Sequence, residues 1–181
     1  MDGLTALGMS ASQANDFVDM LSATIINSNT GVEQMQEAFT NVAPIAGTLE
    51  ISMSDLSVAL GLMANNGVKG AKAGTALKNL LSRLASPTEK VTACIQKYNL
   101  EGARQKIING DLIGGIKELQ TQINGLSASE KTAIITTIAG REALSGISAL
   151  MNSNTKDINN LKFAVDSATK SGRYYAESLG L

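Results

Sequence analysis

Apolar residues recur every three to four positions along most of the chain, which is the period of an amphipathic α-helix. The stretch that follows Gly70 is a regular example, and it stops before Pro87. Its apolar residues form one stripe on the helix surface: Ala73, Ala76, Leu77, Leu80, Leu81 and Leu84. No segment alternates apolar and polar residues strongly enough to build a sheet, so the pattern predicts an all-α fold.

Two helices are expected before residue 50. The first ends at the polar run NSNTG and carries its apolar residues on one face: Ala14, Phe17, Val18, Leu21 and Ile25. The second begins at TGVE, which resembles a capping box with Thr30 as the N-cap and Glu33 at the third helical position. Because Pro44 lacks a backbone N–H, we expect it to end or kink this helix near Ala43.

The segment from Met53 to Ala64 is apolar on almost every side, which is typical of a helix buried in the centre of a domain. Ser52 to Asp55 offers a cap for its start, and Gly67 offers a left-handed cap beyond its end. The sequence therefore predicts a central helix with capping residues at both ends.

The second half of the chain is divided by glycines but keeps a helical period. A short helix is expected over residues 88–98, and the less regular residues 99–126 still place apolar residues at helical spacing. Ser127 is expected to cap a helix that contains AIITTIA, a run rich in β-branched residues for which no partner strand is evident. Further helices are expected over residues 141–151 and from Thr155 onward.

The last helix carries a heptad pattern, because its apolar and small residues recur at alternating spacings of three and four. The residues of this seam are Ile158, Leu161, Val165, Ala168, Gly172, Tyr175 and Leu179. Two interpretations stay open: the helix packs on the rest of the domain, or it forms a coiled-coil stem that continues beyond Leu181. The chain is accordingly divided into a helical core domain at residues 1–154 and a C-terminal heptad-like helix at residues 155–181.

The composition indicates an aliphatic core and gives no sign of a polyanionic partner. The 181 residues include 15 Lys and Arg against 16 Asp and Glu, and this net charge of −1 argues against nucleic acid or an anionic membrane as a partner. Aromatic residues make up only 3% and Trp is absent. No apolar run approaches the ~20 residues that span a bilayer. The first ten residues also lack the features of a signal peptide, so we expect a soluble chain without membrane contact.

The residue types that most catalytic and metal sites need are missing. Without histidine the chain cannot form a Ser-His-Asp or Cys-His site, and a single cysteine cannot bind zinc alone. Cys94 is expected to be a buried, inert thiol. Ser167 and Lys170 match a serine–lysine spacing, but four-residue matches are common by chance. Glu33 and Glu37, one helical turn apart, are expected to be solvated. We therefore predict no enzymatic activity and no catalytic, cofactor-binding or metal-binding residues.

Three glycines, Gly67, Gly70 and Gly74, raise the question of a phosphate-binding loop. A Walker loop needs four residues between its glycines, followed by Gly-Lys-Ser/Thr, but only three separate Gly70 from Gly74 and Thr75 follows. A dinucleotide fingerprint needs a preceding strand, and here a helix precedes. The spacing puts Gly70 and Gly74 on one helix face, where another backbone can come close. We therefore predict that they serve helix packing or the entry turn.

Three segments together resemble the core region of phage tail tape-measure proteins. Residues 46–91 read AGTLEISMSDLSVALGLMANNGVKGAKAGTALKNLLSRLASPTEKV, where a helix ends at a Gly-x-x-Gly turn and AGTAL, a Leu/Arg-rich helix and SP follow. TIAGREALSGISALM at residues 137–151 and SGRYYAE near the end resemble the same family, so the resemblance covers nearly all of residues 7–177. One departure is Glu50, where similar sequences often have glycine before ISM. A non-glycine residue in a left-handed turn costs about 1 kcal/mol.

The resemblance implies a structural segment of a phage, prophage or phage-tail-like particle. Tape-measure proteins set tail length as helical rulers and occupy the lumen of the tail tube while its subunits polymerise around them. The partners that the resemblance implies are tail-tube subunits, distal tail or baseplate proteins, tail assembly chaperones and further copies of the chain. The implied location is the interior of the tail tube in the virion, and the host cytoplasm before assembly. No cofactor is implied.

Two other classes of protein are alternatives. The chain is alternatively a non-catalytic helical segment of a tail-associated protein that degrades peptidoglycan. The missing histidine and scarce aromatic residues argue against catalysis within these residues themselves. A membrane-inserting pore or toxin would need a long apolar hairpin, and the sequence contains none.

Overall fold

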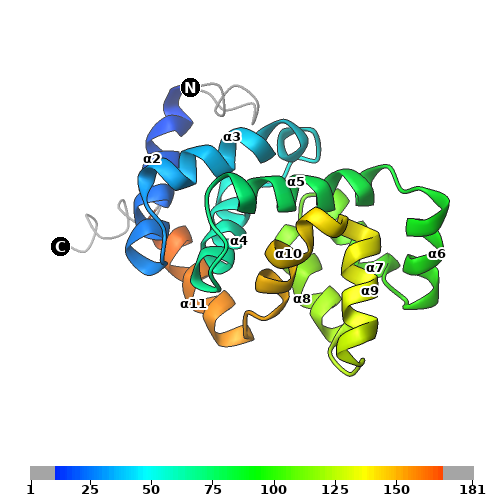
Figure 1. Ribbon diagram of the computed structural model, residues 1–181. Coiled ribbons are helices and arrows are strands. Elements are labelled where there is room, and N and C mark those ends of the chain that lie inside the picture. The colour runs from blue at the N-terminus through cyan, green and yellow to red at the C-terminus, as the bar shows by residue number, and fades with distance from the viewer. Residues whose placement is uncertain (1–10, 169–181) are drawn as a thin grey trace.

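The computed structural model describes residues 11–168, which form ten α-helices and one short 3-10 turn without a β-strand among them (Figure 1). This confirms the predicted all-α fold. The elements are α2 (Ala11–Asn27), α3 (Val32–Thr48), α4 (Met53–Asn65), α5 (Ala71–Ala85), α6 (Glu89–Lys97), α7 (Glu101–Ile108), α8 (Leu112–Ile123), α9 (Ala128–Ala139), η1 (Arg141–Ala143), α10 (Leu144–Met151) and α11 (Thr155–Ser167). No helix in the described range has the length and apolar character that a membrane crossing requires.

Helix α4 lies at the centre of the molecule, as its uniformly apolar sequence predicts. Every residue from Ser54 to Ala64 is buried, and α4 packs against α2, α11, α10, α8, α5 and α3 (Figure 1). The helix begins at Ser52, whose hydroxyl oxygen accepts a hydrogen bond from the Asp55 backbone N–H at 3.0 Å. The chain leaves α4 through Gly67, which has φ +92°. Both predicted ends of the central helix are confirmed.

Helices α3 and α5 run side by side because Gly74 has no side chain (Figure 1). A Cβ atom at position 74 would lie 2.4 Å from the carbonyl oxygen of Ala38 and 2.8 Å from its Cα atom, so only glycine permits this approach. Gly70 stands at the start of α5 with φ +67°, a backbone conformation that favours glycine. Gly74 therefore serves helix packing and Gly70 shapes the entry turn, as predicted.

The remaining predicted helices and caps in the second half are also present. Thr88 and Ser127 cap α6 and α9 with their hydroxyl oxygens, which accept backbone N–H groups three residues further along. The β-rich run AIITTIA is helical in α9, with Ile134, Ile135 and Ile138 buried. Tertiary packing of these isoleucines outweighs their intrinsic preference for strands.

The predicted start of α3 is wrong by one residue. Gly31, not Thr30, is the N-cap, and its backbone N–H donates to Oε1 of Gln34 at 3.1 Å. Gln34 therefore takes the position expected for Glu33, which is exposed. The bond from the N-cap backbone N–H to the side chain at the third helical position is therefore present, with glutamine in place of the expected glutamate.

Helix α3 continues through Pro44 to Thr48, so the proline does not end the helix near Ala43, and the alternative, a kink there, stays a prediction. Pro44 lies on the exposed side of the helix, where water can reach the carbonyl group that loses its N–H partner. Ala43 and Ala46 beside it are buried against the core. Packing on the inner face therefore holds the helix together across the proline.

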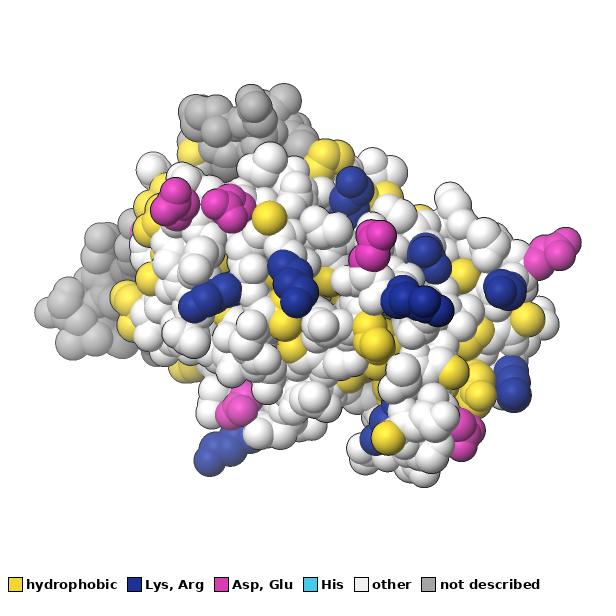
Figure 2. All heavy atoms as spheres, in the orientation of Figure 1, with side chains coloured by type: hydrophobic (Ala, Val, Ile, Leu, Met, Phe, Trp, Pro, Cys, Tyr) yellow, Lys and Arg dark blue, Asp and Glu magenta, His cyan; other side chains and the backbone are white. Residues whose placement is uncertain are grey.

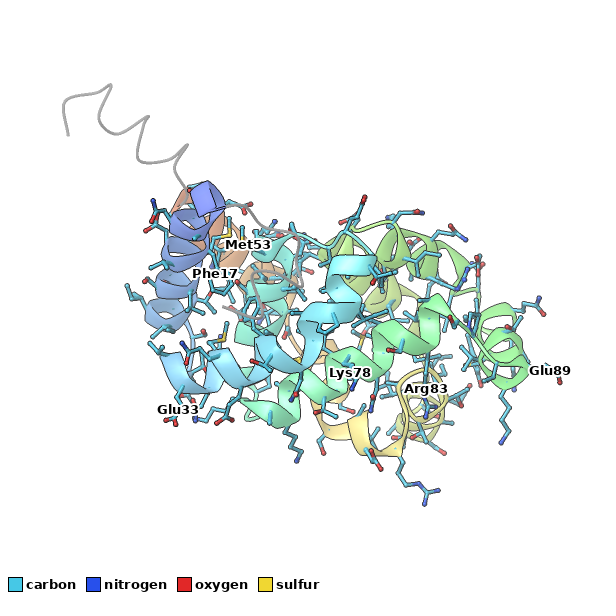
Figure 3. All side chains as sticks on the ribbon, turned by 90° about the horizontal axis from the view of Figure 1, so that it is seen from above. Phe17, Glu33, Met53, Lys78, Arg83 and Glu89 are labelled. Carbon is cyan, nitrogen blue, oxygen red and sulfur yellow. The ribbon has the colours of Figure 1, made fainter. Side chains whose placement is uncertain are left out.

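Helix α11 packs against α4 and α2. Phe17 of α2, labelled in Figure 3, contacts Phe39 of α3 edge to face, with ring centroids 5.1 Å apart. Within the seam, Ile158, Leu161 and Val165 are buried. These three residues belong to the core of the described domain. The seam residues from 172 onward lie outside the described residues.

Candidate functional site

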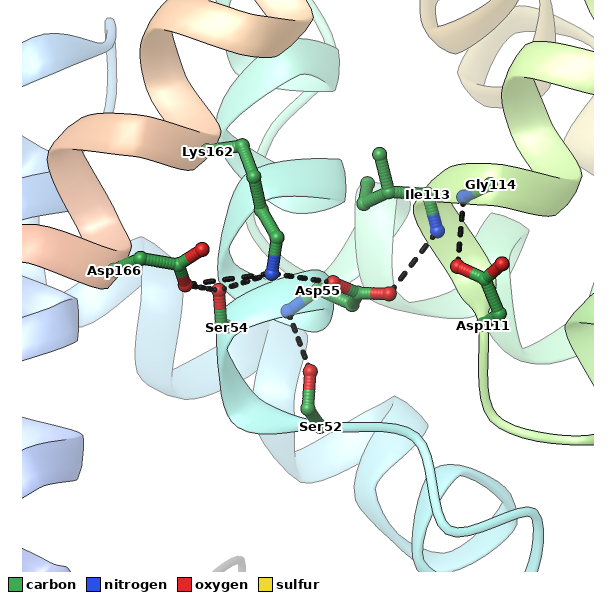
Figure 4. Close-up of polar contacts among 8 residues, drawn as sticks. All are labelled: Ser52, Ser54, Asp55, Asp111, Ile113, Gly114, Lys162 and Asp166. Carbon is green, nitrogen blue, oxygen red and sulfur yellow. Dashed lines mark hydrogen bonds and ion pairs between the residues drawn. The ribbon is translucent and has the colours of Figure 1, made fainter.

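A cluster of polar side chains, which extends from buried residues of α4 to exposed Asp166 of α11, lies where α4, α8 and α11 meet (Figure 4). Asp55 is its centre, and only 6% of this residue is exposed. One carboxylate oxygen, Oδ2, accepts a hydrogen bond from the backbone N–H of Ile113 at 3.1 Å, in the first turn of α8. The N–H groups of a first helical turn lack partners within the helix, and the helix dipole favours a negative charge there. Asp55 therefore joins the start of α8 to the start of α4.

Lys162 of α11 approaches the same carboxylate from the other side (Figure 4). Its Nζ atom lies 2.8 Å from Oδ1 of Asp55, 2.7 Å from the hydroxyl oxygen of Ser54 and 3.3 Å from Oδ1 of Asp166. The Ser54 hydroxyl in turn donates to Asp166. An ammonium group has three protons to donate, so all three have an acceptor. We call Ser54, Asp55, Lys162 and Asp166 the polar clasp.

The clasp contains a serine and a lysine in hydrogen-bond contact, which is the arrangement of a Ser–Lys catalytic pair. Such a lysine must be neutral to take the serine proton, so its pKa must lie below the usual range. Burial alone would lower the pKa of Lys162, but the hydrogen bond and charge of Asp55, together with Asp166, hold it above its ordinary value. Lys162 is therefore a charged donor to Ser54. The geometry fits a polar contact that links α11 to α4 better than a catalytic serine with its lysine base.

The candidate residues from the sequence that the structure describes lie on three different helices, α3, α6 and α11. Ser167 is the last residue of α11, and Lys170 lies outside the described residues. Glu33 and Glu37 are both exposed on α3. Cys94 is buried, and this burial raises the pKa of its thiol despite the nearby charge of Lys97. A raised pKa disfavours the reactive thiolate.

Among residues 11–168, no three His, Cys, Asp or Glu side chains are grouped so that they could hold a metal ion. Asp55 and Asp166 both face Lys162, whose ammonium group occupies the place between them. The positive charge between the two carboxylates of the clasp is therefore the ammonium group of Lys162.

Sequence reasoning missed the clasp. In the sequence, Asp55 is recognisable only as part of a helix cap. Lys162 follows the seam residue Leu161 on a helix of polar character. The two residues are 107 positions apart. No local spacing signals such a pair, because the tertiary packing of α4 and α11 brings it together.

The fold and the clasp define a class of protein: an all-helical domain whose clustered polar side chains connect helices. The family model for phage-related minor tail proteins matches residues 1–140, and the chain belongs to this family.

Two curated relatives carry the name that the sequence resemblance led us to expect. The tape measure protein of Pneumococcus phage Dp-1 is 30% identical over 179 residues, which is 97% of this chain but 15% of that protein. A probable tape measure protein of Escherichia phage P2 is 27% identical over 135 residues, 74% of this chain and 17% of that protein. The resemblance to phage tail tape-measure proteins is thereby confirmed, and the chain spans a small part of these relatives. No solved structure matches the chain.

Proposed function

We propose that the chain is a structural segment of a phage tail tape-measure protein that sets tail length and occupies the lumen of the tail tube during assembly. The observation that carries the proposal is the similarity to the Dp-1 tape measure protein across 97% of the chain. The proposal requires the helices to run end to end in the tube, because only a continuous helix rises ~1.5 Å per residue, whereas the helices of residues 11–168 fold back on one another.

The proposal includes partners and a location. A ruler inside a tube contacts the tail-tube subunits along its length, and distal tail or baseplate proteins at its end. Tail assembly chaperones accompany the chain in the host cytoplasm, and further copies of the chain lie beside it in the particle. No nucleic acid or membrane belongs to this set.

We propose a non-catalytic role for these residues. The charged state of Lys162 supports this, because a protonated lysine cannot act as the base for Ser54. The burial of Cys94 and the lack of histidine point the same way. A peptidoglycan-degrading activity in the parent protein would have to come from residues outside this chain.

Protease protection tests the proposed location. Purified tails that contain the parent protein are digested before and after the tube is disassembled with denaturant, and peptides from residues 11–168 are quantified by mass spectrometry. The peptides should survive in intact tails and disappear after disassembly, while an exposed tail protein is digested in both samples. Digestion of residues 11–168 in intact tails, or their absence from tails, would contradict the proposed place in the lumen.

A further inference from the structure

A groove of about 830 Å³ lies between α8, α9, α10 and the start of α11, away from the polar clasp. Figure 2 shows the surface indented along its lower edge, between the start of α11 and the turn from α8 to α9. The volume falls within the roughly 300–1,000 Å³ that is common for binding sites. Ile123, Ile135 and Met151 contribute the large apolar side chains of its lining. Ile123 and Ile135 are buried, with 3% and 4% of their surface exposed, so Met151 offers the accessible part of this apolar lining.

The charge in the groove has one sign. Its lining includes Lys117 and Lys131 and no Asp or Glu, although the whole chain carries 16 acidic against 15 basic residues. The charged side chains that line the groove are therefore both positive.

The acidic side chains nearest in sequence lie outside the lining of the groove. Glu130 accepts a hydrogen bond from the Ser127 hydroxyl at 3.2 Å, and Asp157 accepts one from the side-chain amide of Asn154 at 3.0 Å. Both carboxylates keep their negative charge in these bonds and are held at the capping residues of their own helices.

The two lysines keep donors available. Lys117 donates to Oδ1 of Asn159 at 2.6 Å, which uses one of its three protons. Within the described part of the chain, the Lys131 side chain makes no hydrogen bond or ion pair. A partner that brings carboxylates would gain charge-assisted hydrogen bonds without breaking existing ones.

We propose that this groove binds an acidic peptide segment of a partner protein, with carboxylates at Lys117 and Lys131 and with an apolar side chain against Met151. Charge complementarity selects this occupant, because a basic segment would be repelled by the two lysines. The proposal stands on the groove alone and does not depend on the proposed role in a tail.

Nuclear magnetic resonance titration of the 181-residue chain tests the proposal. The probe is a short peptide with glutamates on both sides of two central leucines, and its matched forms carry glutamine or lysine in place of glutamate. The glutamate peptide should shift the signals of Lys117, Lys131, Ile123, Ile135 and Met151. Binding should weaken as salt screens the charges. The glutamine form should bind at least about tenfold more weakly and the lysine form more weakly still.

Substitutions distinguish binding in the groove from a general effect of the net charge of the chain. Lys131→Glu should weaken binding of the glutamate peptide by about tenfold or more. Lys78→Glu makes the same change of net charge at an exposed site on α5 outside the groove and should leave binding intact. Lys131→Gln should give an intermediate loss, and circular dichroism melting verifies that each variant is folded. The proposal is overturned if the glutamate peptide does not bind, if the glutamine form binds equally well, if the shifts map elsewhere, or if Lys131→Glu behaves like Lys78→Glu.

Discussion

At the scale of single residues, the backbone turn after α3 depends on Glu50. This residue has φ +56°, which confirms the left-handed position that the sequence comparison with glycine suggested. The Ile51 N–H reaches back to the Ala46 carbonyl at 3.0 Å, and the Glu50 N–H reaches the Gly47 carbonyl at 3.2 Å. These two bonds form a Schellman-type helix end, in which glycine is the preferred left-handed residue.

Glu50→Gly should raise the free energy of unfolding by a few tenths to ~1 kcal/mol, because removal of the strained side chain outweighs the added entropy of the unfolded chain. Denaturant titration measures the change. Glu50→Ala is the matched control, since it removes the charge but keeps a Cβ atom in the left-handed turn, and it should give no comparable gain. A clear loss of stability in Glu50→Gly would show that the turn does not carry this strain.

Gly74→Leu should lower the free energy of unfolding by ~1–3 kcal/mol or prevent folding, because the new side chain must displace the Ala38 backbone. Thermal and denaturant unfolding measure the effect. Gly125→Leu is the control, since a Cβ atom there meets nothing within 4 Å. Equal stability of the two variants would mean that α3 and α5 do not approach at Gly74 as described.

At the scale of helices, the seam of α11 shows what periodicity can and cannot predict. Ile158, Leu161 and Val165 are buried against the domain's own helices, so this part of the seam is core. The same spacing would suit a second copy of the chain, because a heptad pattern specifies an apolar face and not its partner. Pro44 gives the opposite lesson: a strong local signal for a helix end was overridden by packing on the inner face of α3.

Leu161→Glu together with Val165→Glu should abolish most of the helical signal, because two unpaired carboxylates would be buried beside α4 and α2. Circular dichroism and sedimentation velocity, measured on the same samples, report folding and assembly. Phe163→Glu on the same helix is the control, since Phe163 is 75% exposed and should tolerate the charge. A double variant that stays folded and only shifts from oligomer to monomer would show instead that the seam joins separate chains.

The clasp predicts how stability changes at alkaline pH. The pKa of Lys162 is raised in the folded chain above its ordinary value of 10.5, so the folded state holds this proton more tightly than the unfolded state does. Its contribution to stability is complete below that ordinary value and is lost as pH rises through the folded pKa. The stability difference between the wild type and Lys162→Met should therefore be constant near neutral pH and shrink above about pH 10.5. Denaturant titrations across this range measure it, and a constant or growing difference would contradict the described ion pairs.

At the scale of the whole molecule, the order of helices and most caps could be predicted, because they depend on local periodicity and on residues such as Ser52, Thr88 and Ser127. The clasp and the groove could not be predicted. Asp55 and Lys162 meet only after α4 and α11 pack, and the groove is lined from four separate helices. The absence of histidine excludes a histidine-based site within these residues, but it does not indicate that Ser54 and Lys162 come into contact.

Tail length tests the central claim most directly. Residues 11–168 are deleted in frame from the parent protein, or duplicated, and the lengths of the assembled tails are measured by electron microscopy. If this segment runs through the tube as a continuous helix of the ruler rather than as the packed domain, deletion should shorten the tails by up to roughly 240 Å, given a rise of ~1.5 Å per residue, and duplication should lengthen them by a similar amount. Lys162→Met in the otherwise intact parent protein should leave the length unchanged, because it alters the clasp and not the number of residues. Tails of wild-type length in both the deletion and the duplication would contradict the account.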